Sequence, residues 1–276
     1  MDLKDEVEPK LIRNISNELG WNTPGRSYSS FKQPRTFHEL IILGNLKSLL
    51  MNRIKYMLLL LLLASFTWCH AQTPSSKPVF VIVHGAWGGG WAFKKVDSLL
   101  REKGVIVYRP TLTGQGERVH LASTSVGLQT HITDVVNLIL FENLQDVILV
   151  GHSYGGMVIT GVADSVGSRI RKLVYLDALF PYNGESLASI QGATDRLSAV
   201  KCGFIPPTWV KPGTPPPHDV PHQLKTFTDT LWLKHGSSPL PTTYILTVDP
   251  GADPVKDDFA SQAARARKKP GVKMLQ

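Results

Sequence analysis

The sequence has little cysteine and no apolar run long enough for a comfortable membrane span. Only two of its 276 residues are cysteines, Cys69 and Cys202, and no spacing of cysteine and histidine suggests a zinc site. The strongest apolar run is six leucines at residues 58–63, whereas a spanning helix needs about 20 apolar residues. We therefore expect no internal disulfide, no bound metal and no stable membrane span in the mature protein.

Acidic residues are fewer than basic ones, but the excess is modest. The net charge is +8 overall, and residues 72–276 carry 21 Lys and Arg against 16 Asp and Glu. Part of this excess lies in residues 265–273, in a pattern typical of the solvated face of one helix. A basic tail can bind nucleic acid, but this composition leads us to expect no nucleic-acid partner.

Residues 51–71 have the pattern of a secretory signal peptide. A basic start with Arg53 precedes the leucine run, and the segment ends at the small residue Ala71, after which we expect cleavage. Because such signals begin a chain, we expect Met51 to be the initiator and residues 1–50 to be mis-assigned translation or a disordered extension. The alternative is a cytosolic extension ahead of an internal signal-anchor. The pattern predicts a secreted or periplasmic protein.

The most informative motif is Gly-His-Ser-Tyr-Gly at residues 151–155. It follows the aliphatic run 147–150, a short buried strand, and precedes a small-residue segment at 156–163 that is typical of a closely packed helix. A strand entering a helix through Gly-x-Ser-x-Gly is a nucleophile elbow, in which the serine has strained backbone angles and an exposed hydroxyl. The motif predicts Ser153 as a catalytic nucleophile.

A second glycine-rich loop supports this interpretation. The buried strand 79–83 ends in His-Gly-Ala-Trp-Gly-Gly-Gly-Trp at residues 84–91. Backbone amides that stabilise an oxyanion come from such a loop and from the residue after the nucleophile. We expect the donors to be the amides of Ala86, with Trp87 as the next candidate, and of Tyr154.

Two histidines and one tryptophan flank these motifs. His84 precedes the nucleophile in the chain, so we expect it to be structural. His152 is expected to pack beside the elbow, where it and Trp87 are candidates for contact with substrate.

The remaining sequence alternates strands and helices, which predicts a doubly wound, mostly parallel sheet. Beyond those already named, strands are expected at 105–108, 172–176 and 243–247, the start of a last strand at 272–275, and helices around 92–103, 127–141 and 256–268. The proline-rich segment 178–241 interrupts this alternation. With Trp209, Phe227 and Trp232 it predicts a lid over the serine; the alternative is a surface loop or small helical subdomain.

Taken together, the motifs resemble the α/β-hydrolase fold, and within it the small esterases that include plant methylesterases and hydroxynitrile lyases. The resemblance covers residues 78–275 and implies hydrolysis of a small ester through Ser153 without a cofactor. The matching stretches are 81–87, Gly90-Trp91, Thr113-Gly114-Gln115-Gly116, 151–156 and Leu176-Asp177-Ala178.

The resemblance places the catalytic acid just after the strand at 243–247. Asp249 follows the strand end most closely, and Asp253 is the alternative. Either could also be a solvated loop carboxylate.

The base is where the sequence departs from the family. The fold orders its triad Ser, Asp, His, but no histidine follows His235, and His218, His222 and His235 precede the candidate acids. We therefore expect a domain at 72–276 that lacks its C-terminal strand and helix and hydrolyses esters poorly. The alternatives are a non-catalytic ligand-binding relative and a hydroxynitrile-lyase-like enzyme.

Overall fold

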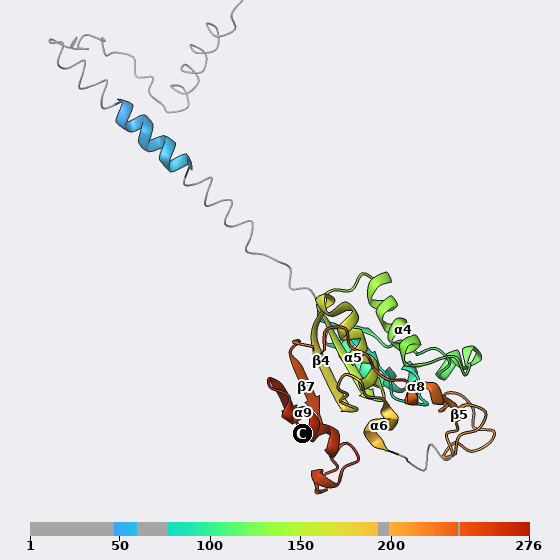
Figure 1. Ribbon diagram of the computed structural model, residues 1–276. Helices are drawn as coiled ribbons and strands as arrows, with labels where there is room; N and C mark the ends of the chain where they lie inside the picture. The colour runs from blue at the N-terminus through green and yellow to red at the C-terminus, as the bar shows by residue number, and fades with distance from the viewer. Residues whose placement is uncertain (1–46, 60–76, 193–198, 237) are drawn as a thin grey trace, which may run out of the picture. The chain divides into compact units, whose positions relative to one another are not determined.

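The computed structural model describes residues 47–59, 77–192, 199–236 and 238–276 (Figure 1). The chain divides into two units, Met1–Pro74 and Ser75–Gln276. In the first unit residues 47–59 form a helix whose side chains are exposed. None of the helices in the described ranges is both long enough and apolar enough to cross a membrane. Residues 60–71 of the expected signal peptide, including Cys69, lie outside the described residues.

The second unit is built on a six-stranded sheet in the order β2-β1-β3-β4-β7-β8, with every neighbouring pair parallel. Its strands are β1 (Val79–Val83), β2 (Ile106–Tyr108), β3 (Val147–Ser153), β4 (Ile170–Ala178), β7 (Thr242–Ile245) and β8 (Val272–Leu275). The predicted α/β class and parallel sheet are confirmed. Parallel strands connected through helices are covered on both faces, which explains their nearly continuous apolar runs.

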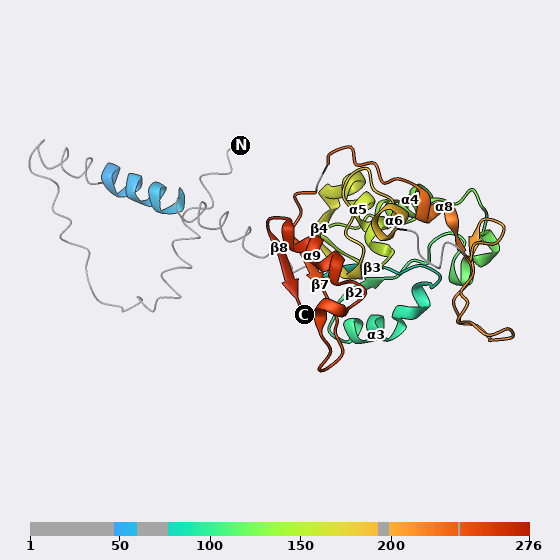
Figure 2. The ribbon, with the colours of Figure 1, turned by 60° about the horizontal axis from the view of Figure 1, so that its bottom comes forward.

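Helices cover both faces of this sheet (Figures 1 and 2). Residues of α4 (Leu128–Phe141), α5 (Gly155–Val166) and α9 (Ala260–Lys268) share the larger apolar core with Val81 and Val83 of β1. The intervening Ile82 instead packs in a smaller core with Leu100 of α3 (Lys94–Glu102). Successive side chains of a strand point to opposite faces, so this alternation places α3 on the opposite face from α4, α5 and α9.

The expected start of a last strand at 272–275 is confirmed, and the expected loss of the C-terminal strand and helix stays a prediction. Residues Val272–Leu275 form β8 and pair with β7 in parallel register, from Thr242 with Val272 to Ile245 with Leu275. The amide of Leu246 adds a hydrogen bond of 3.0 Å to the carbonyl oxygen of Leu275. These four residues therefore extend the sheet beyond β7, because each one is aligned with a residue of β7.

In its described residues, 178–192, 199–236 and 238–241, the segment expected to be a lid contains α6 (Leu187–Gln191), β5 (Phe204–Ile205), β6 (His222–Gln223) and α8 (Leu224–Thr228). Strands β5 and β6 form a separate antiparallel pair. The exposed Cys202, which precedes β5, has a free thiol. This segment is thus a small folded layer rather than a simple loop.

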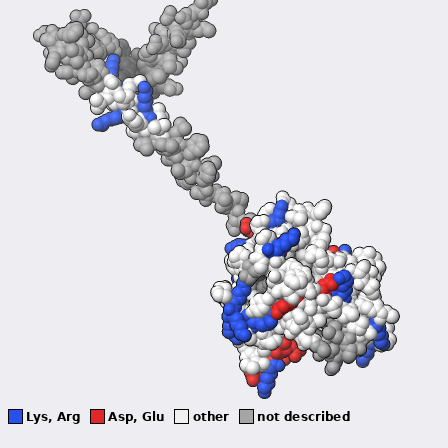
Figure 3. Space-filling view, in the orientation of Figure 1, with Lys and Arg blue, Asp and Glu red and all other residues white. Residues whose placement is uncertain are grey.

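Basic side chains gather over the end of the domain that carries α9 and β8 (Figure 3). The sequence predicted that the basic residues of this region form a solvated helix face, but two of them bind other parts of the domain. Arg265 forms a salt bridge with Glu185, and its guanidinium lies 4.4 Å from the centre of the Tyr182 ring. Lys269 Nζ donates to the carbonyl oxygen of Ser238 at 2.9 Å. These two cations therefore join α9 and its C-terminal end to the lid segment.

Candidate active site

Ser153 lies at the junction of β3 and α5, in the geometry that its motif predicts. Its φ is 51°, in the left-handed region where a non-glycine residue is strained. A side chain on Gly151 would place Cβ 2.7 Å from the carbonyl oxygen of Gly155. The glycine at 151 is thus required by close backbone approach, and the turn directs the serine out from the carboxyl end of β3.

The loop after β1 packs directly on this elbow. A Cβ at Gly85 would lie 2.9 Å from Cβ of Ser153, and one at Gly155 would lie 2.6 Å from the carbonyl oxygen of Val83. Ala86, the next residue of the loop, is half-buried. The structure therefore brings the loop that carries Ala86 beside the nucleophile and the start of α5, as an oxyanion hole requires.

Trp87 is held by the lid segment rather than exposed toward solvent. Its φ is 65°, its amide donates to Nδ1 of His222 at 3.2 Å, and its indole Nε1 donates to the carbonyl oxygen of Ile205 at 2.9 Å. Its ring contacts Trp209 edge-on at 5.1 Å and Phe227 at 5.7 Å. Of the two amides proposed on this loop, that of Trp87 is already used by His222, which favours Ala86 as the donor.

The aromatic lid residues separate into two groups. Phe227 is buried and Trp209 covers the Trp87 ring. Trp232 is 74% exposed and lies near Gly184. The expectation that Trp232 lines the lid interior is therefore wrong; its neighbour Leu231 takes the buried position instead.

The side chain of Tyr154 is fully buried behind the elbow. Its hydroxyl is 3.0 Å from Nδ1 of His131, and burial raises the pKa of Tyr154 far above its usual value. Nε2 of His131 lies 2.9 Å from the carbonyl oxygen of Thr113. The residue after the nucleophile is thus anchored from behind, which fixes the direction of its backbone amide.

His84 is a structural residue in this geometry. Its Nδ1 donates to the carbonyl oxygen of Gly85 at 2.7 Å, and its Nε2 accepts from the amide of Leu112 at 3.0 Å. This pair of bonds requires a neutral ring with the proton on Nδ1. Burial lowers the pKa of His84 to about 4, so the ring remains neutral at physiological pH.

His152 packs next to the elbow on the side of α3. Its ring lies 5.8 Å from that of Phe93, and a Cβ at Gly85 would come within 3.1 Å of its Nδ1. Burial lowers the pKa of His152, and the charge of Asp177 partly opposes this shift. The ring is half-buried, so contact with a substrate stays a prediction.

The three lid histidines lie in different places. His222 is completely buried, with its Nε2 bonded to Thr226 Oγ1 at 2.8 Å. His235 is exposed and pairs with Asp164 at 3.3 Å, while His218 lines a separate cavity. In the described ranges no hydrogen bond joins a histidine to Ser153 Oγ.

The two candidate acids differ in what they already bind. Asp249 is exposed, and its backbone oxygen accepts from the amide of Ala252. The carboxylate of Asp253 accepts from the amide of Val255 at 3.0 Å and caps a short 3₁₀ turn, Pro254–Lys256. Asp253 thus has a local structural role as a cap. The carboxylate of Asp249 has no such hydrogen bond among the described residues.

Asp177 lies at the end of β4, and the sequence alone assigned it no role. It has a φ of 40° at a register irregularity where Ser153 pairs with Ala178. Its carboxylate accepts from both the amide and the hydroxyl of Thr247, the former at 2.7 Å. The bond connects the end of β4 to the segment that leads to Asp249. The position of Asp177 at the end of a buried strand was the feature of the sequence that could have identified it.

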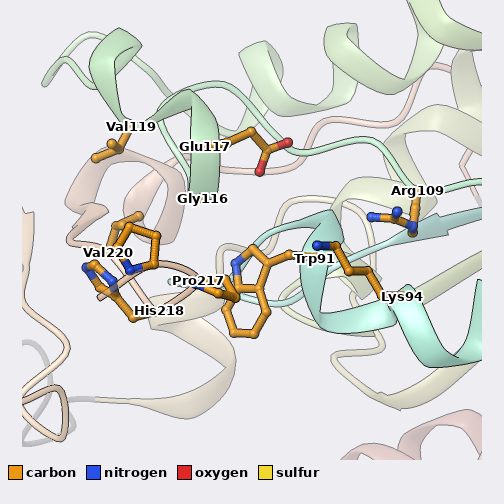
Figure 4. Close-up of a pocket in the computed structure, with 10 residues that line it drawn as sticks. Trp91, Lys94, Arg109, Gly116, Glu117, Val119, Pro217, His218 and Val220 are labelled. Atoms are coloured by element: carbon orange, nitrogen blue, oxygen red, sulfur yellow. The ribbon is translucent and has the colours of Figure 1, made fainter. Parts of the chain in front are cut away.

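A cavity of 590 Å³ lies beside the glycine-rich loop (Figure 4). Its walls come from Trp91 and Lys94, from the segment 116–119, and from the lid segment 216–220. Ser153, Ala86 and Tyr154 are not among its lining residues. This cavity is therefore next to the glycine-rich loop but separate from the nucleophile.

The parallel sheet, the elbow and the adjoining amide loop define a protein of the α/β-hydrolase class. The chain belongs to the alpha/beta hydrolase family, whose profile matches residues 80–274.

Within this family the chain is related to several named enzymes. It is 57% identical over 111 residues to a carbendazim hydrolyzing esterase from Nocardioides sp., covering 40% of this chain and 46% of that protein. It is 30% identical over 107 residues to methylesterase 2 from Arabidopsis thaliana, covering 38% and 41%. The chain thus spans less than half the length of these curated relatives. The solved structure of tomato methylketone synthase I matches at 19% identity with a TM-score of 0.56, covering 72% and 89%, and this likeness shows the fold.

Proposed function

We propose that this protein hydrolyses a small carboxylic ester through an acyl-enzyme on Ser153. The observation that carries the proposal is the backbone of Ser153, strained at a φ of 51° between β3 and α5 and packed against the loop of Ala86. A buried or merely structural serine does not require this turn. The 57% identity to an esterase supports the choice of ester chemistry.

In the proposed mechanism the hydroxyl oxygen of Ser153 attacks the ester carbonyl. The amides of Ala86 and Tyr154 donate to the oxyanion that develops, the C–O bond to the alcohol breaks, and an acyl-serine forms. Water then releases the acid. The residues provide this chemistry without requiring a cofactor.

The proton transfers need an acid and a base. We assign the acid to Asp249, with Asp253 as the alternative, because both follow β7. Residues 1–276 contain no histidine after His235, and the buried His84 and His222 already bind backbone groups. We therefore expect the polypeptide of residues 1–276 to turn over slowly, since loss of the base costs several orders of magnitude in kcat.

Hydrolysis of 4-nitrophenyl acetate, followed by nitrophenolate release and by intact mass, tests the proposal. Residual turnover and an acetyl adduct should both disappear in Ser153→Ala and persist in Ser98→Ala, which changes an exposed serine of α3. An adduct that persists in Ser153→Ala would contradict the assignment of the nucleophile. Rapid Ser153-dependent turnover would contradict the expected loss of rate.

A second candidate function is ligand binding without turnover. It is favoured by one observation: in the part of the chain that the structure describes, no histidine bonds to Ser153 Oγ. Stoichiometric binding of an ester that is recovered unchanged, with equal affinity in Ser153→Ala, would support it. Multiple turnovers per enzyme that depend on Ser153 would exclude it.

We also propose that residues 51–71 direct export and that cleavage follows Ala71. The basic start, leucine run and small final residue support this proposal. N-terminal sequencing of the exported protein should begin at Gln72. Retention of residues 51–71 on the exported protein would contradict cleavage.

A further inference from the structure

The cavity beside the glycine-rich loop has the chemistry of a second binding site. It holds 590 Å³, within the range typical of small-molecule sites. Val119, Pro216, Pro217 and Val220 provide apolar walls, and Trp91 provides an aromatic one. Figure 4 shows Lys94 extending toward the Trp91 ring, with Pro217 and His218 on the lid side.

Two buried polar atoms on the lining residues have no hydrogen-bond partner. They are Nε1 of Trp91 and Nδ1 of His218. A buried polar group without a partner is costly, and each such group in a folded protein requires an explanation. Neither nitrogen has accessible surface in this structure, so an acceptor in the cavity would reach it only after the side chain turned.

The polar side chains that line the cavity also favour a ligand that accepts hydrogen bonds. Lys94 and Arg109 can only donate, and Glu117 is the one acidic residue that lines the cavity in the part of the chain that the structure describes. Arg109 already binds Asp97 and the carbonyl oxygen of Gly90, so it mainly fixes the wall. Lys94 is exposed on its helix and has no salt bridge among the described residues.

The lid wall of this cavity is bonded directly to the candidate oxyanion loop. The amide of Val220 donates to the carbonyl oxygen of Trp87 at 2.9 Å, and Asp219 accepts from Nε1 of Trp209 at 2.8 Å. A ligand that contacts residues 216–220 therefore contacts the segment that holds Trp87. The cavity therefore lies next to the proposed oxyanion loop, but none of the residues proposed to be catalytic lines it.

We propose that this cavity binds a small monocarboxylate with an apolar body, whose carboxylate pairs with the ammonium of Lys94 beside Trp91. The apolar body packs against Pro217, Val119 and Val220, and His218 closes the lid side. The proposal does not depend on ester hydrolysis, because Ser153 does not line the cavity.

Benzoate is the probe, titrated by calorimetry into the full chain carrying Ser153→Ala. We expect saturable binding that weakens about tenfold in Lys94→Met, through loss of a charge-assisted bond. Lys95→Met, which removes the neighbouring exposed lysine, should leave affinity unchanged. Benzyl alcohol has the same ring without the charge and should bind at least about tenfold more weakly.

The indole ¹⁵N–H resonance of Trp91 locates the bound probe. It is assigned as the signal missing in Trp91→Phe, and it should shift on titration with the same dissociation constant as the calorimetric signal. Absence of saturable binding would overturn the proposal. So would binding that leaves the Trp91 signal unmoved and is unaffected by Lys94→Met, because benzoate would then occupy another place. Failure of ester turnover bears only on the proposed function.

Discussion

The amide of Trp87 donates a hydrogen bond of 3.2 Å to Nδ1 of His222, a residue 135 positions further along the chain. His222 must then carry its proton on Nε2, which donates to Thr226 Oγ1. The lid segment thus fixes the loop that presents Ala86 to the nucleophile. This relationship joins the lid segment to the loop that we propose as the oxyanion hole.

Replacing His222 tests that coupling. His222→Leu removes the acceptor of the Trp87 amide and should lower the free energy of unfolding by about 1–3 kcal/mol. His222→Asn keeps an acceptor near the position of Nδ1 and should lose less. Urea denaturation measures both, with His120→Leu, an exposed histidine, as the control. Equal stability of the Leu variant and the unchanged protein would contradict the coupling.

Stability should fall as the pH is lowered from about 6.5. Burial lowers the pKa values of His84, His131 and His222 in the folded protein, that of His84 to about 4. Below their ordinary value of 6.5 the unfolded chain binds protons that the folded chain excludes. Each histidine that stays neutral therefore costs about 1.4 kcal/mol per pH unit. Denaturation midpoints between pH 7.5 and 4.5 measure this loss.

Replacement of two of the three histidines separates this effect from general acid denaturation. His84→Gln and His131→Gln remove titrating groups while retaining polar side chains. Each variant should be less stable at pH 7.5 but should have a shallower dependence of stability on pH below 6.5. An unchanged slope in both variants would show that other groups cause the acid sensitivity.

The elbow should tolerate no side chain at Gly155. A Cβ there would lie 2.6 Å from the oxygen of Val83 and 2.9 Å from that of His84, both backbone atoms that cannot move aside cheaply. Gly155→Ala should destabilise the protein by several kcal/mol, about the cost of severe overpacking. Thermal denaturation checks this. Gly167→Ala is the matched control, because its Cβ meets nothing within 4 Å at a φ of −53°, and its stability should be unchanged or higher.

Asp177 and Thr247 should be energetically coupled. Asp177→Asn weakens two hydrogen bonds to Thr247, and Thr247→Val removes one of them. Charge-assisted bonds at a partly exposed site predict a coupling energy of about 1 kcal/mol in a double-mutant cycle. Strictly additive losses of unfolding free energy in the double variant would show that the bond contributes nothing.

Local sequence was enough to predict the strands and the elbow. The aliphatic runs at 79–83 and 147–150 correspond to β1 and β3, and Gly-x-Ser-x-Gly gave the strained position of Ser153. The glycine pattern of the elbow and the hydrophobicity of a strand each involve only a few consecutive residues. They can therefore be recognised in the sequence before the tertiary structure is known. Boundaries shifted where tertiary pairing extended an element: β3 continues to Ser153 because β4 pairs with it there.

The errors arose where contacts are distant in the chain. The pairing of β8 with β7 depends on residues some 30 positions away in the chain, so the short run 272–275 indicated a strand without indicating its partner. The exposure of Trp232 and the burial of His222 depend on which lid face meets the core, and nothing within the lid sequence specifies that.

By itself the sequence determined the fold class and the strained turn at Ser153, because both depend on short patterns of backbone conformation and hydrophobicity. Only the tertiary structure decided that His222 holds the Trp87 loop, that Asp177 binds Thr247, and that Trp91, Lys94 and His218 line one cavity. These groups belong to separate segments, and their chemistry emerges only when burial of the apolar core brings the segments together.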